Sequence, residues 1–142
     1  MILNVDLTSE VPLYQQLRDR IVEAIAGGVL TEGSSLPATR ALAADFGINF
    51  HTVNKGYDLL RQEGLLRLGR KSGAVVRRDA GSGPPDPGWA QEWTGRLRTL
   101  LAEAAAQGMP AEDIVRECEA ALADFAFPAA AAEAWKGSGS PP

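Results

Sequence analysis

The sequence predicts a mostly α fold with a small β wing: a winged helix-turn-helix domain over residues 1–78, followed by a C-terminal helical hairpin over residues 89–127. Three helix-like segments come first, each with apolar residues at helical spacing and a glycine at its end. Two strand-like runs follow them, "LLRL" and "GAVVRR", joined by "GRKS". A stretch rich in proline and glycine at residues 79–88 then predicts a linker before two further amphipathic segments.

The first predicted helix lies within "VPLYQQLRDRIVEAIAGG". Pro12 occupies its first turn, and Gly27 and Gly28 end it. Its apolar residues recur at every fourth position, which is typical of a helix with one buried side: Leu13, Leu17, Ile21 and Ile25. The preceding "ILNVDL" fits either a short strand or an extended arm.

The second and third predicted helices are separated by a tight turn at Gly47. The second helix, "LPATRALAADFG", has Pro37 near its start. The third helix, "INFHTVNKGYDLLRQEG", has Asn49 as its N-cap and Gly64 as its C-terminal break. A short turn that contains glycine between two helices is what a helix-turn-helix motif requires.

The third helix has an apolar side and a polar side when its residues are placed about 100° apart. Val53, Gly56, Tyr57 and Leu60 form the apolar stripe, which we expect to pack against the first two helices. The polar side and the N-terminal end carry donors, acceptors and one cation, which suit the major groove of DNA. These candidate DNA contacts are Asn49, Phe50, His51, Thr52, Asn54 and Lys55. The alternative is a solvated polar face. Asp58 would repel phosphate, so we expect the contact zone to end before it.

Two further places add to the predicted DNA-contacting surface. Arg70 and Lys71 lie at the tip of the connection between the strands, beside Ser72 and Gly73, where cations commonly contact phosphates or the minor groove. The alternative for this connection is an ordinary solvated loop. Arg40 lies near the start of the second helix, an end that can abut the DNA backbone.

Residues 1–77 resemble the DNA-binding domain of GntR-family transcriptional regulators. The motifs "PLYxQL", "GxLxxGxxLP", "RxLAxxxGI", "TVxKxY" and "EGL" occur in the family's order and spacing, followed by "GRKSGAVV". The opening "LNVDLTSEVPLYQQL" and the short remainder are most similar to the YtrA-type subfamily. The resemblance implies that Arg40, residues 49–54 and residues 70–73 contact operator DNA.

Four residues depart from the usual pattern of that family. Glu32 replaces a proline, and Lys71 replaces the first glycine of the wing. Ala38 replaces a serine that caps the second helix, which should weaken this helix by ~1 kcal/mol. Phe50 replaces an arginine or proline, so a common DNA contact is lost. We expect the Phe50 ring either to touch a thymine methyl group or to fold back onto the protein.

The segment after the linker predicts two helices with a break at Gly108 and Pro110, and a tail over residues 128–142. Two such helices cannot enclose a core alone, so their apolar sides need a partner. A second copy of the chain is the simplest partner, and a homodimer would set two third helices about one DNA turn apart. The alternative is packing against the chain's own winged helix. The predicted dimerisation residues are Trp89, Trp93, Leu97, Leu100, Leu101, Ile114, Val115, Cys118, Leu122 and Phe125.

The charge is unevenly distributed along the 142 residues. The net charge is −4 and the pI is about 5.0. Residues 1–78 carry 10 basic and 8 acidic side chains, whereas residues 79–142 carry 4 and 10. This asymmetry suggests two roles, of which DNA binding falls to the first part. The acidic pI also suits a rival function, a winged-helix module for protein–protein interaction that binds no operator.

Other classes of protein are disfavoured by the sequence. Cys118 is the single cysteine, which excludes an intramolecular disulfide and predicts a buried thiol in a reducing cytoplasm. The N-terminus lacks the pattern of a signal peptide, and no apolar run reaches the ~18 residues of a membrane span. The sequence has one histidine and one cysteine, and it has no phosphate-binding glycine loop or nucleophile elbow. It therefore favours neither an enzyme nor a metal or cofactor site.

The sequence therefore predicts a cytoplasmic transcriptional regulator, more specifically a repressor. We expect it to bind an inverted-repeat operator in double-stranded DNA as a homodimer. A small-molecule effector that releases the DNA would be the third partner, although no residue pattern names one.

Overall fold

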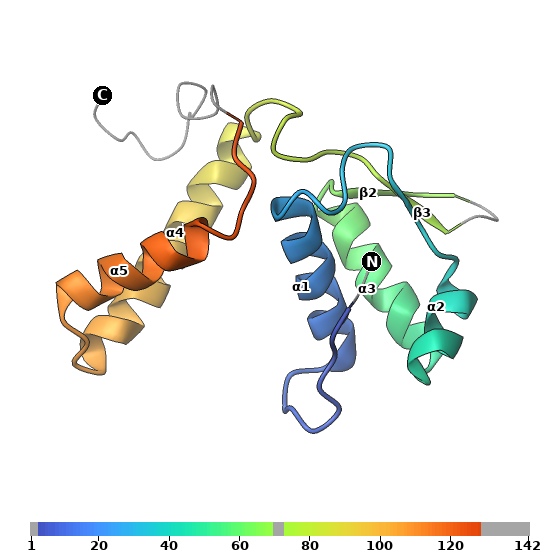
Figure 1. The fold of residues 1–142 in the computed structure, drawn as a ribbon, viewed down its shortest axis with the longest axis horizontal. Coiled ribbons are helices and arrows are strands. Elements are labelled where there is room, and N and C mark those ends of the chain that lie inside the picture. Colours follow the sequence, from blue (N-terminus) through green and yellow to red (C-terminus); the bar gives the residue numbers. More distant parts are fainter. Residues whose placement is uncertain (1–2, 70–72, 129–142) are drawn as a thin grey trace. The chain divides into compact units, whose positions relative to one another are not determined.

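The computed structural model describes residues 3–69 and 73–128 (Figure 1). The chain divides into two compact units, Met1–Ser82 and Gly83–Pro142. The first unit contains α1 (Leu13–Ala26), β1 (Ser35–Leu36), α2 (Thr39–Phe46), α3 (Phe50–Gln62), β2 (Leu66–Leu68) and β3 (Ala74–Val76). The second unit contains α4 (Pro87–Ala106) and α5 (Ala111–Leu122). This order of elements confirms the predicted mostly α fold with a small β wing.

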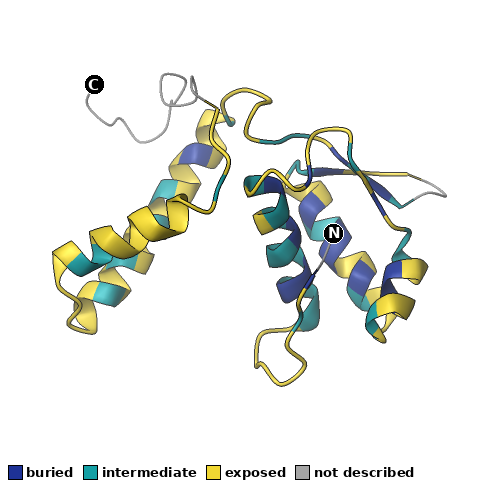
Figure 2. Ribbon diagram, viewed as in Figure 1, coloured by how far each residue is buried: buried dark blue, intermediate teal, exposed yellow. Residues whose placement is uncertain are grey.

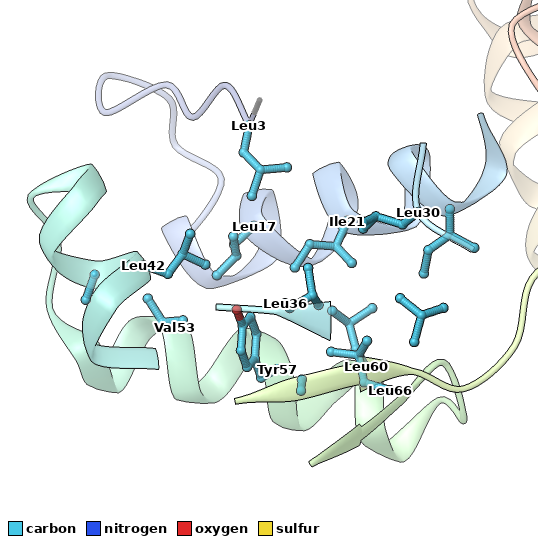
Figure 3. Packing of buried hydrophobic residues seen from close by; sticks show 14 residues of the cluster. Leu3, Leu17, Ile21, Leu30, Leu36, Leu42, Val53, Tyr57, Leu60 and Leu66 are labelled. Atoms are coloured by element: carbon cyan, nitrogen blue, oxygen red, sulfur yellow. The ribbon is translucent and has the colours of Figure 1, made fainter. Parts of the chain in front are cut away.

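One hydrophobic core holds the first unit together, because α3 packs against α1, α2 and β2 (Figure 3). The predicted apolar stripe of α3 is confirmed, since Val53, Gly56, Tyr57 and Leu60 are all buried. The core also receives side chains from the arm, α1, the loop after α1, α2 and the three strands: Leu3, Leu17, Ile21, Ile25, Leu30, Leu36, Leu42, Ala43, Leu66, Ala74 and Val76.

Gly56 lets α1 and α3 approach each other closely. A Cβ atom at this position would lie 3.1 Å from the carbonyl oxygen of Tyr14 and 3.2 Å from Cδ2 of Leu17. Both distances are shorter than the ordinary separation of non-bonded carbon atoms. The missing side chain at Gly56 therefore places α3 directly against the backbone of α1.

The wing is part of a three-stranded antiparallel sheet with the order β1-β3-β2. Leu66 pairs with Val76 and Leu68 pairs with Ala74, while Leu36 pairs with Ala74 from the other side. Both predicted strands are confirmed as β2 and β3, but the third strand, β1, was not predicted. A strand of two residues, Ser35–Leu36, is too short to show the alternation by which strands are recognised in a sequence.

A single buried amide fixes the N-terminal arm against α1. The Gln16 side chain accepts a hydrogen bond from the Asp6 N–H (2.7 Å) and donates to the carbonyl oxygens of Asp6 (2.9 Å) and Val11 (2.8 Å). Leu3 is buried in the core, and residues 3–6 form no strand. Of the two alternatives for "ILNVDL", the described part is an extended arm.

The helix ends in the first unit follow the sequence signals. The Asn49 side chain caps α3, because its Oδ1 accepts a hydrogen bond from the His51 N–H (2.8 Å). Gly47 has the left-handed conformation (φ +66°) that the turn between α2 and α3 requires. Ala38 is the N-cap residue of α2 and provides no side-chain hydrogen bond, as its sequence predicts.

The second unit is a helical hairpin whose bounds differ from the predicted ones. The Asp86 side chain caps α4 by accepting from the N–H groups of Gly88 (3.0 Å) and Trp89 (3.3 Å). Because Pro87 suits the first helical position, α4 begins two residues before the expected start of the hairpin at residue 89. α5 ends at Leu122, so Phe125 lies beyond the helix in which the stripe had placed it.

The second unit leaves most of its apolar side chains uncovered (Figure 2). Among residues 83–128, Ala90 is the only buried residue, whereas Leu100 is 61% exposed and Val115 is 55% exposed. Cys118 is exposed, so the prediction of a buried thiol was wrong for the single chain. Two helices provide no third layer to cover it. None of the helices in the described residues is long and apolar enough to cross a membrane.

Candidate nucleic-acid interface

The N-terminal end of α3 presents the polar residues that the sequence singled out. Asn49, His51, Asn54 and Lys55 are exposed, and Thr52 is half-buried. Because these residues occupy the cap and the first two turns of one helix, they form a continuous surface. The dipole at this end of the helix favours an anion such as phosphate.

An open hollow of about 330 Å³ lies beside this surface. Arg40 from α2, Asn54 from α3 and Gly73 from the start of β3 all line it, although they lie far apart in the sequence. The fold therefore brings three of the predicted contacts together. Arg70, Lys71 and Ser72 lie outside the described residues, but their neighbours Gly69 and Gly73 line the hollow.

The carbonyl group of Pro37 lies against two residues that line this hollow, Tyr57 and Gly73. The Tyr57 hydroxyl of α3 donates a hydrogen bond to the Pro37 carbonyl oxygen at 2.8 Å. Gly73 lies so close that a Cβ atom there would be 2.6 Å from the same oxygen and 2.8 Å from the backbone nitrogen of Ala38. Gly73 also has a φ of +80°, which favours glycine. The segment between β1 and α2 thus fixes both α3 and the base of the wing.

The hydrogen bond between Tyr57 and Pro37 was not predicted from the sequence. The feature of the sequence that could have indicated such a bond is the Tyr57 hydroxyl group, because a buried tyrosine in an apolar stripe needs a hydrogen-bond partner. Its acceptor lies 20 residues away in the sequence, so no local pattern identifies it.

Two cations at this surface lie over aromatic rings. Cζ of Arg40 is 4.1 Å from the centroid of the Phe50 ring, and Nζ of Lys55 is 4.0 Å from the centroid of the Tyr14 ring. The Phe50 ring is half-buried and packs against the core, so this residue has folded back onto the protein. Of the two alternatives for the Phe50 ring, this half-buried position agrees with the one in which the ring folds back onto the protein.

Asp58 lies about one turn of α3 beyond Asn54 and Lys55. Its carboxylate accepts hydrogen bonds from Arg61 (2.8 Å) and Gln62 (2.7 Å), which lower the pKa of Asp58 below its usual range. The group is therefore negative at neutral pH and disfavours phosphate beyond the first two turns of α3.

The bond between Tyr57 and Pro37 predicts a pH-dependent stability. Tyr57→Phe removes one hydrogen bond and should lower the free energy of unfolding by about 0.5–1.5 kcal/mol at pH 7. Burial raises the pKa of Tyr57 from 10.0 to about 12, so its contribution is fully present below pH 10 and is lost towards pH 12. We therefore expect the difference between the two proteins in urea denaturation to shrink between pH 10 and pH 12.

Tyr14→Phe is the matched control, because the Tyr14 hydroxyl makes no hydrogen bond within residues 3–69 and 73–128. It should leave stability within ~0.5 kcal/mol of the wild type. Equal losses in the two variants would show that the Pro37 contact contributes nothing to folding.

Comparisons with known proteins identify the family to which residues 13–76 belong. The family described as "Bacterial regulatory proteins, gntR family" matches residues 13–76. The HTH-type transcriptional regulator Rv1152 of Mycobacterium tuberculosis is 29% identical over 98 residues, which are 69% of this chain and 81% of the relative. The HTH-type transcriptional repressor YtrA of Bacillus subtilis is 31% identical over 78 residues, which are 55% of this chain and 60% of the relative.

Other relatives are much longer than this chain. An uncharacterized HTH-type transcriptional regulator of Rhizobium meliloti, RB1450, is 40% identical over 68 residues, and the chain spans 28% of its length. Among solved structures, a transcriptional antiterminator from Listeria monocytogenes has a TM-score of 0.76. Its identity is 23% over 84% of this chain and 88% of that one, which supports the fold alone.

A second solved structure extends the likeness beyond the fold. It is YtrA from Sulfolobus acidocaldarius, described as a GntR-family transcription factor, and its TM-score is 0.58. The sequences are 36% identical over 75% of this chain and 99% of that chain. The chain therefore belongs to the gntR family of bacterial regulatory proteins, and it is similar to YtrA-type members of that family.

Proposed function

We propose that this DNA-binding regulator is a cytoplasmic repressor that binds an inverted-repeat operator as a homodimer. The observation that carries the proposal is the common hollow of Arg40, Asn54 and Gly73 at the N-terminal end of α3. Three separate segments, α2, α3 and the base of the wing, border this one hollow beside the helix that would enter the major groove. Two relatives, YtrA of Bacillus subtilis and MngR of Escherichia coli, are described as repressors.

The first two turns of α3 enter the major groove in this proposal. Asn54 is exposed and projects from the helix next to the hollow, so we assign it a base edge, since an asparagine amide pairs with adenine. Lys55 and Arg40 supply positive charge to phosphates on either side. The remaining contacts come from the start of α3 and from the wing: Asn49, His51, Thr52, Arg70, Lys71, Ser72 and Gly73.

The second unit holds two copies of the chain together in this proposal. Its exposed apolar residues include Trp89 (42%), Leu100 (61%), Val115 (55%) and Leu122 (51%). The Trp89 and Trp93 rings stack with centroids 6.5 Å apart, which gives α4 a broad apolar surface. Self-association covers such a surface by isologous pairing. A small-molecule effector that releases the DNA would bind among these paired helices.

The DNA-binding part of the proposal is tested by selecting bound duplexes from a random pool at a fixed salt concentration. We expect two half-sites in inverted orientation, about one turn apart. Asn54→Ala should then reduce the discrimination between the selected duplex and single-base variants by ~1–3 kcal/mol, because it removes a base contact. Fluorescence anisotropy measures both affinities.

Arg40→Ala is the comparison for this experiment, because a lost phosphate contact weakens binding to all duplexes alike and reduces the salt slope by about 0.9 per site. A uniform loss in Asn54→Ala would make Asn54 a backbone contact instead. A wild-type chain that enriches no duplex would favour the rival function, a module for protein–protein interaction.

The dimer is tested by light scattering at micromolar concentration. We expect a mass near twice the 15.0 kDa of one chain. Leu100→Asp should shift the protein towards the monomer, because it places a charge on the apolar side of α4. Val29→Asp is the matched control, since Val29 is 68% exposed in the first unit and should leave the dimer intact. A wild-type protein that scatters as a monomer would contradict the proposed dimer.

A further inference from the structure

We propose that Phe50 is a positioning residue that holds the Arg40 guanidinium group in place for a DNA phosphate without neutralising its charge. This role rests on the proposed function. It gives a physical task to the residue that departs most from the usual family pattern at the start of α3.

Packing against the core holds the Phe50 ring in place. Phe50 is the first residue of α3, directly after the Asn49 cap, and its half-buried ring packs against the hydrophobic core. Cζ of Arg40 lies 4.1 Å from its centroid, within the range of a cation–π interaction. The His51 ring lies 4.1 Å from the same centroid at an angle of 33°. Arg40 at the start of α2 is thereby linked to the start of α3.

The cations of the first unit are held in two different ways. Arg18 pairs with Glu63 at 2.6 Å, Arg20 pairs with Glu23 at 2.7 Å, and Arg61 pairs with Asp58 at 2.7 Å. Within residues 3–69 and 73–128, Arg40 and Lys55 pair with no carboxylate and lie over aromatic rings instead. Arg67 and Arg77 likewise pair with no carboxylate within these residues, so Arg40 and Lys55 are distinguished by the aromatic ring beneath each cation, and both border the N-terminal end of α3.

This difference matters for a polyanionic partner. A carboxylate holds a guanidinium group in place but cancels its charge, whereas an aromatic ring holds it and leaves the charge available. Stacking uses the flat face of the guanidinium group, so its N–H donors at the edge remain free for phosphate oxygens. A side chain that is already ordered also loses less conformational entropy when DNA binds. The Phe50 ring is then unavailable as a reader of thymine methyl groups.

Duplex binding by Phe50 and Arg40 variants tests the proposal, with the selected duplex as the probe. Phe50→Leu should weaken binding ~2–5-fold for each half-site, uniformly across duplex sequences, because only the cation–π contact is lost. Phe50→Trp should retain the affinity, since tryptophan is the best ring for a cation. The double variant Phe50→Leu/Arg40→Ala should bind no more weakly than Arg40→Ala alone.

Phe46→Leu is the matched control for lost packing, because Phe46 also packs half-buried against the core but lies over no cation in the described residues. It should lower thermal stability and leave duplex affinity unchanged. Additive losses in the double variant would overturn the proposal. A loss confined to duplexes with thymine at one position would overturn it in favour of a base contact.

A readout in the free protein separates this role from the proposed function. The Phe50 ring should shift the side-chain proton resonances of Arg40 upfield, and Phe50→Leu should abolish the shift. Absence of the shift in the wild type would overturn the proposal even if duplex binding is strong. A wild-type chain that shows the shift but binds no duplex would instead overturn the proposed function, and the role of Phe50 with it.

Discussion

The carbonyl group of Pro37 is the contact on which the whole polar surface of the first unit depends. It accepts the hydrogen bond from Tyr57 and leaves room only for a glycine at position 73. Because Pro37 directly precedes Ala38, the N-cap residue of α2, these contacts place α3, the start of α2 and the base of the wing around one point. A helix that reads bases in the major groove discriminates between them only if its neighbours hold it in a fixed orientation. The contacts of the Pro37 carbonyl group therefore link the hydrophobic core to the proposed DNA contacts.

The two units solve different physical problems. In the first unit, side chains from three helices and three strands cover one another, and the polar side of α3 is left for a ligand. In the second unit, α4 and α5 leave large apolar side chains such as Leu100 exposed, so a homodimer would complete a core that one chain only begins. The uneven charge agrees with this division, because acidic side chains outnumber basic ones 10 to 4 in residues 79–142, whereas basic ones outnumber acidic ones 10 to 8 in residues 1–78.

Local patterns predicted the helices, and in the first unit also their ends, because helical periodicity, the Asn49 cap and the left-handed Gly47 are each specified by neighbouring residues. Contacts between distant segments were not predicted. The strand Ser35–Leu36 forms only because β3 lies beside it, and the bonds of Tyr57 and Phe50 join residues 20 and 10 positions apart. Periodicity correctly identified the helix that carries Cys118 on an apolar stripe. It could not show whether Cys118 is buried, because burial depends on what covers the stripe.

The most direct measurement of the part played by the Pro37 contact is the duplex affinity of Gly73→Ala compared with that of Gly64→Ala. Both glycines have a φ of +80°, but a Cβ atom at Gly64 meets nothing within 4 Å, whereas one at Gly73 would lie 2.6 Å from the Pro37 oxygen. Both variants carry similar backbone strain, and only Gly73→Ala displaces the wing from α2. We expect Gly73→Ala to bind the selected duplex at least ~10-fold more weakly than Gly64→Ala, a difference of about 1.4 kcal/mol. Equal affinities in two folded variants would contradict the dependence of DNA binding on this contact.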